Sequence, residues 1–135
     1  MSNIYDDVEN LQAEFEAFKT AFNLTTGQTV ATNERFNGKT VYCKTVDIGS
    51  LPNATNKLIS SGLTMSDITV VRLEGVARNS GGTTIPLPNP TPSTNYLIGC
   101  FITAAGNIQI DTVVDRSDYT GIIRVYYTNN SETTE

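Results

Sequence analysis

The side chains best suited to catalysis or metal binding in this sequence are three aspartates late in the chain, Asp111, Asp115 and Asp118. Two carboxylates facing each other could supply the acid and the base of a glycosidase. Several together could bind calcium, but the twelve-residue ligand order of an EF-hand is absent. The segment 115–118 also has the composition of a turn in which aspartates bond to the backbone. We expect that turn, and we assign no catalytic residue.

The absence of histidine narrows the chemistry further. Ser-His-Asp catalysis, Cys-His catalysis and most zinc sites all require that residue. The serine and glycine pairs at 60–62 and 80–82 match neither a nucleophile elbow nor a phosphate-binding loop. Cys43 and Cys100 lie among apolar residues, which favours two buried thiols, because a disulfide would need adjacent strands in register. We expect no enzyme, no cofactor and no metal.

Composition and charge limit the partners. The chain has 135 residues, 39% of them hydrophobic, and a formal net charge of −5. This predicts one globular domain with an appendage and no general attraction to nucleic acid or anionic lipid. The N-terminus has no basic and apolar leader, and no apolar run approaches the roughly 18 residues of a membrane span. We expect a soluble protein without a secretory signal.

Tyrosines are more promising as binding residues. Tyrosines close to Asn, Ser and Thr suit the recognition of polar surfaces such as sugars, although tyrosine is also an ordinary residue of β-strands. The residues in question are Tyr42, Tyr96, Tyr119, Tyr126 and Tyr127. We predict Tyr96 and Tyr119, together with Asn95, as the candidates for surface recognition.

The first 25 residues carry a heptad pattern. Apolar residues recur at alternating spacings of four and three, which is typical of the a and d positions of a coiled coil. They are Ile4, Val8, Leu11, Phe15, Phe18 and Phe22. The bulky phenylalanines favour a wider core than a dimer has, so we predict a homotrimer. Because so short a helix is marginal alone, the heads must also associate. The alternative is a surface helix docked on its own domain.

After this helix the apolar pattern changes to the alternation of β-strands. We predict a coiled-coil helix at 1–25, a polar linker at 26–37, a head at 38–128 and a flexible tail at 129–135. Strands are expected at 40–48, 56–60, 68–77, 84–87, 95–103, 107–113 and 121–128, with a bulge or bend at Gly75. Short strands separated by turns predict a mainly β fold, an antiparallel, jelly-roll-like β-sandwich.

Three segments of this head resemble a small β-domain of tailed-bacteriophage fibre and baseplate proteins. Residues 37–53 (NGKTVYCKTVDIGSLPN) resemble its opening, residues 84–88 (TIPLP) its middle, and residues 115–121 (DRSDYTG) with the strand ending YYT at 126–128 its close. Together they cover about 36–128, in the expected order. Cys43 departs from the pattern, since a charged residue is usual there.

The resemblance implies a structural protein of the virion, assembled in the host cytoplasm. Such domains usually sit at the outer end of trimeric fibres behind coiled-coil stalks, and some are implicated in attachment to bacterial surface polysaccharide. The chain is short for a tail fibre, which favours a head fibre or a fibre segment held by other virion proteins through the N-terminal helix. The alternative is a capsid or baseplate decoration or adaptor protein that recognises no host.

Overall fold

The structure, a computed structural model, describes residues 7–14 and 26–133. The described chain is mainly β, with one N-terminal helical segment at 7–14 and two single-turn 3₁₀ helices, η1 (Met65–Asp67) and η2 (Thr94–Tyr96). The strands are β1 (Thr29–Phe36), β2 (Lys39–Ser50), β3 (Asn56–Ser60), β4 (Ile68–Asn79), β5 (Thr84–Leu87), β6 (Ile98–Ile102), β7 (Asn107–Thr112) and β8 (Tyr119–Asn129).

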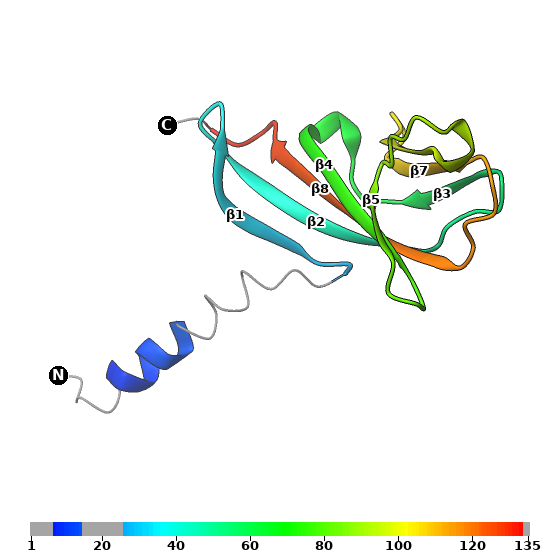
Figure 1. Ribbon diagram of the computed structural model, residues 1–135. Helices are drawn as coiled ribbons and strands as arrows, with labels where there is room; N and C mark the ends of the chain where they lie inside the picture. The colour runs from blue at the N-terminus through cyan, green and yellow to red at the C-terminus, as the bar shows by residue number, and fades with distance from the viewer. Residues whose placement is uncertain (1–6, 15–25, 134–135) are drawn as a thin grey trace.

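The strands form two antiparallel sheets. The larger has the order β1-β2-β8-β4-β5, and the smaller has the order β3-β7-β6. The long strands β2, β8 and β4 run side by side, with β3 and β7 forming part of the second sheet (Figure 1). β6 and β7 form a hairpin, and Gly106 in its turn has a positive φ, which glycine adopts without strain.

The main core draws residues from both sheets. Ile123 and Val125 come from the central strand β8, while Ile108 and Ile110 come from β7 of the smaller sheet, and all four are fully buried. A second, smaller cluster lies around β1 and β2 and consists of Val30, Val41, Cys43 and Tyr126. We call the face of the larger sheet that carries this second cluster the outer face.

Two predicted boundaries differ from the structure. The predicted linker at 26–37 contains β1, an edge strand that pairs with β2. The predicted flexible tail is tied to the head, because the Asn130 amide donates to the Asp67 carbonyl and the Glu132 carboxylate accepts from the Thr40 amide. Both segments are polar, so apolar periodicity gives no signal for them, and hydrogen bonds to the rest of the head hold them in place.

Gly75 serves a different purpose from the one predicted. It lies opposite Ile123 in a regular ladder, whereas the irregularity in β4 falls between Val70 and Arg72. A Cβ atom at Gly75 would overlap the Ile123 side chain and approach the Ile122 carbonyl oxygen to 2.6 Å. A glycine is therefore needed here because the two strands and the core side chain approach each other closely, not because the strand bulges.

Both cysteines are free thiols. Burial raises the pKa of the Cys100 thiol to about 11, and burial also raises the pKa of Cys43. Because the thiolate is the reactive form, we expect a chromogenic disulfide reagent at pH 8 to label the native protein slowly, and both thiols quickly in urea. Rapid labelling of one thiol per native chain would contradict this burial.

Candidate functional site

The turn at 115–118 has the predicted geometry. The Asp115 Oδ1 atom accepts hydrogen bonds from the backbone amide and the hydroxyl of Ser117, at 2.9 and 2.6 Å. These bonds lower the pKa of the Asp115 carboxyl group, since they favour its charged form. Asp111 lies on β7 and accepts a hydrogen bond from Gln109. In the described residues no group of three or more acidic or cysteine side chains is placed to hold a metal ion.

This turn brings two of the predicted recognition residues together. The guanidinium group of Arg116 lies 5.2 Å from the ring centre of Tyr96 and 5.7 Å from that of Tyr119. Both distances are within the range of a cation–π contact. Tyr96 is 55% exposed, and its neighbour Asn95 is also exposed.

Tyr119 does not behave as predicted, because it is only 8% exposed and packs into the main core. Its ring lies near Arg116 but is too buried to contact a ligand. Arg116 was not predicted as part of the site, although its position between two aspartates in a turn was visible. The exposed part of this cluster is Tyr96 with Asn95 and the edge of Arg116.

A second candidate site lies on the outer face of the larger sheet. Cross-strand pairing places side chains there in rows, because directly opposed residues point to the same face. Ile122 on β8 lies between Asp47 on β2 and Val76 on β4, and Arg124 lies opposite Glu74. A groove of about 470 Å³ runs over these strands, and we call it the outer groove. Its lining consists of Glu74, Gly75, Val76, Arg78, Ile122 and Arg124.

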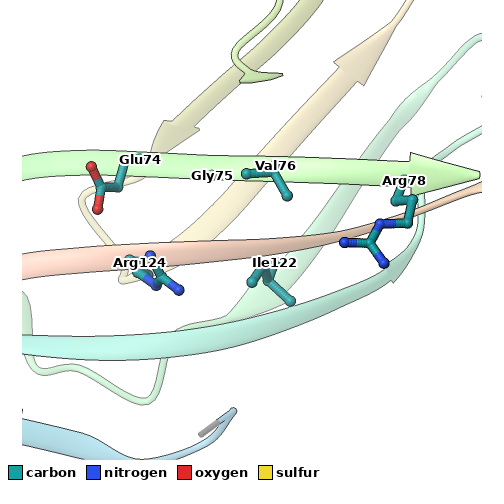
Figure 2. Close-up of a pocket in the computed structure, with 6 residues that line it drawn as sticks. All are labelled: Glu74, Gly75, Val76, Arg78, Ile122 and Arg124. Atoms are coloured by element: carbon teal, nitrogen blue, oxygen red, sulfur yellow. The ribbon is translucent and has the colours of Figure 1, made fainter. Parts of the chain in front are cut away.

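The outer groove has a cationic group at each end and an apolar floor. Figure 2 shows Arg124 and Arg78 at opposite ends, with Val76 and Ile122 between them. A smaller hollow of about 220 Å³ continues past Arg78 and adds Asp47 to the lining. Val76 is exposed although it is apolar, so the floor is open to solvent. The outer groove therefore combines two positively charged side chains with an apolar surface between them.

Glu74 is fixed at one end of this groove by a network across three strands. Its carboxylate accepts a hydrogen bond of 2.6 Å from the Tyr126 hydroxyl and lies 4.0 Å from Arg72. Arg72 also pairs with Glu34 of β1 at 3.4 Å and stacks over the Tyr126 ring at 3.9 Å. Burial and the bond to Glu74 raise the pKa of Tyr126 to about 12, so its hydroxyl remains a donor at neutral pH.

The described helical residues, 7–14, include two of the predicted oligomerisation residues. Val8 is 48% exposed and Leu11 is 64% exposed. The other four, Ile4, Phe15, Phe18 and Phe22, lie outside the described residues. No helix within the described ranges is both long and apolar enough to span a membrane.

No family model, curated protein or solved structure matches the chain.

Proposed function

We propose that this chain is a subunit of a homotrimeric bacteriophage fibre, without enzymatic activity, whose β-rich head contacts the host surface. The proposed trimer is held by a coiled coil of the N-terminal helices. The proposed head is a β-sandwich of the two sheets, with the main core between them. In the alternative, the same head binds another virion protein, as a decoration or adaptor protein of the capsid or baseplate.

The exposure of Val8 and Leu11 is the observation that supports the proposed trimer. Both are apolar, and their spacing of three residues puts them on one side of a helix. A helix docked on its own head would cover these side chains, whereas Val8 is 48% and Leu11 64% exposed in the single chain. Other copies of the helix would cover them, as the a and d residues of a coiled coil do. Light scattering should then give about three times 14.6 kDa.

The contact role of the head is supported by the exposed ring of Tyr96. Aromatic rings with a polar edge suit polar and saccharide surfaces, and Arg116 holds this ring from one side. Tyr96, Asn95 and Arg116 therefore form the proposed attachment surface.

Replacing Tyr96 with alanine is expected to reduce binding of the intact protein to host cell walls, because the exposed ring is lost. Stacking contacts of this kind contribute about 0.5–1.5 kcal/mol, which is roughly a two- to tenfold change in affinity for each copy. A pull-down on cell walls measures it. Phe36→Ala is the matched control, since Phe36 is also an exposed aromatic residue but lies on β1.

The same pull-down separates the two functions. Retention of the protein on purified virion proteins and not on cell walls would overturn host attachment and favour the adaptor. Equal losses from Tyr96→Ala and Phe36→Ala would show that Tyr96 has no special part in binding.

A further inference from the structure

We propose that the outer groove binds an acidic or phosphorylated saccharide, a sugar or polyol that carries one carboxylate or phosphate group. The inference deepens the attachment function and rests on it for the source of the saccharide. The binding itself is a property of the groove residues and can be measured whatever the oligomeric state.

The anionic group of the ligand is indicated by the two arginines. Within the described residues, neither Arg78 nor Arg124 forms a hydrogen bond or an ion pair through its side chain. The Arg124 Nε atom is buried and has no acceptor in the described part of the chain, and the same holds for the Oγ1 atom of Thr45, which lies directly opposite. A buried donor without an acceptor is costly. A carboxylate or phosphate in the groove would match the planar guanidinium fork of Arg78 or Arg124, since both side chains line it.

The relative placement of the arginines suits a ligand longer than a bare anion. Arg78 lies opposite Thr120, and Arg124 is four residues further along β8, which offsets the two by about 13 Å along the strand. Long side chains reduce this gap, but the floor between them is Val76 and Ile122. A ligand that reaches from one arginine toward the other must therefore cross an apolar surface, and the C–H face of a sugar ring can lie on it.

The carboxylates at the rim explain why the ligand should also carry hydroxyl groups. Asp47 uses its Oδ1 atom to accept from the Gly49 amide, and Glu74 uses its Oε1 atom to accept from Tyr126. The second oxygen of Asp47 can accept from a hydroxyl group, and the second oxygen of Glu74, which also lies 4.0 Å from the Arg72 Nε atom, has a further lone pair for one. A bare anion such as inorganic phosphate would be repelled by these carboxylates without using them. The groove is also of the usual size for small-ligand sites, about 300–1,000 Å³.

Titration of the intact, isotopically labelled protein with three probes tests the proposal. The probes are glucuronate, glucose 6-phosphate and neutral glucose, and the readout is the Nε–H signal of each arginine. We expect glucuronate, glucose 6-phosphate or both to move the Arg78 and Arg124 signals, and glucose to leave them in place. The two acidic probes distinguish a carboxylate from a phosphate source. If neither acidic probe moves these signals, the proposal is wrong.

Variants assign the binding to the groove. Arg78→Gln and Arg124→Gln should each weaken binding about tenfold or more, because a charge-assisted bond is lost. Arg35→Gln removes the same charge from an exposed site on β1 and should leave the affinity unchanged. Arg78 is itself exposed, so its replacement should not affect folding.

Two results would overturn the proposal even if binding is seen. Equal weakening by Arg35→Gln would show a general charge effect. If Arg78→Gln dissociates the oligomer in light scattering and probe binding is unaffected, the groove is an interface between copies of the chain. A monomeric wild-type protein that still binds the probes would contradict the proposed fibre and leave the saccharide site standing.

Discussion

Replacing Ile123 with alanine is expected to lower the free energy of unfolding by about 2–5 kcal/mol. Ile123 is fully buried on the central strand β8 and belongs to the core cluster that both sheets share. It also lies opposite Gly75, whose missing side chain leaves room for its Cδ1 atom. Alanine would leave a cavity between strands that are held in place on both sides, so the surroundings could relax only in part. Urea unfolding at a fixed protein concentration measures the loss.

The neighbouring residue provides the matched control for this change. Ile122 is on the same strand but points into the outer groove, where it is partly exposed. Ile122→Ala removes the same atoms and should cost well under half as much, because less apolar surface is returned to water. Equal losses of unfolding free energy from the two variants would contradict the structure, in which Ile123 faces the core and Ile122 faces the outer groove.

Leu11→Asp is expected to convert the proposed trimer to single chains of 14.6 kDa while leaving the head folded. Leu11 is 64% exposed in the single chain, so an aspartate there costs the monomer little. In a coiled coil every copy would bury an unpaired carboxylate at the d position, at a cost of several kcal/mol for each. Light scattering measures the mass, and the urea midpoint of the head reports its folding.

Asn10→Asp is the matched control for assembly. It introduces the same charge one residue away, at a position of the heptad that faces solvent, and the mass should stay at that of the oligomer. A Leu11→Asp protein that keeps the full mass would contradict the coiled coil. A wild-type protein that is already monomeric would contradict the fibre as well.

Much of the strand pattern could be predicted because alternation of apolar residues follows from burial of one face. β3 and β5 have the predicted bounds, and β2, β4 and β8 extend only slightly beyond them. β1 was missed because its sequence is polar and its position depends on pairing with β2. Val76 shares the outer face with Glu74, because the ladder of β4 stays regular at Gly75, where a bulge or bend was predicted.

The sites were harder to predict than the strands. Tyr96 is exposed as expected, but Tyr119 is buried, and no local signal separates two tyrosines in similar polar segments. The outer groove joins Arg78 of β4 to Arg124 of β8, which are far apart in the chain. Only the sheet order makes these strands neighbours. The available hint was the charged residues at alternate positions of β4 and the single Arg124 in apolar β8, since such residues mark a face turned to solvent.

The order of the larger sheet leaves β1 and β5 as its edge strands, and neither is well suited to pair with a further strand. Pro86 gives β5 a position without an amide hydrogen, and the ladder of β1 is interrupted between Ala31 and Arg35. Exposed edges of this kind ordinarily risk runaway aggregation through strand addition. Many copies of the head could therefore lie close together without aggregating through their sheet edges. In the proposed fibre, where several copies of the head would lie close together, the interrupted edges would keep neighbouring sheets from joining.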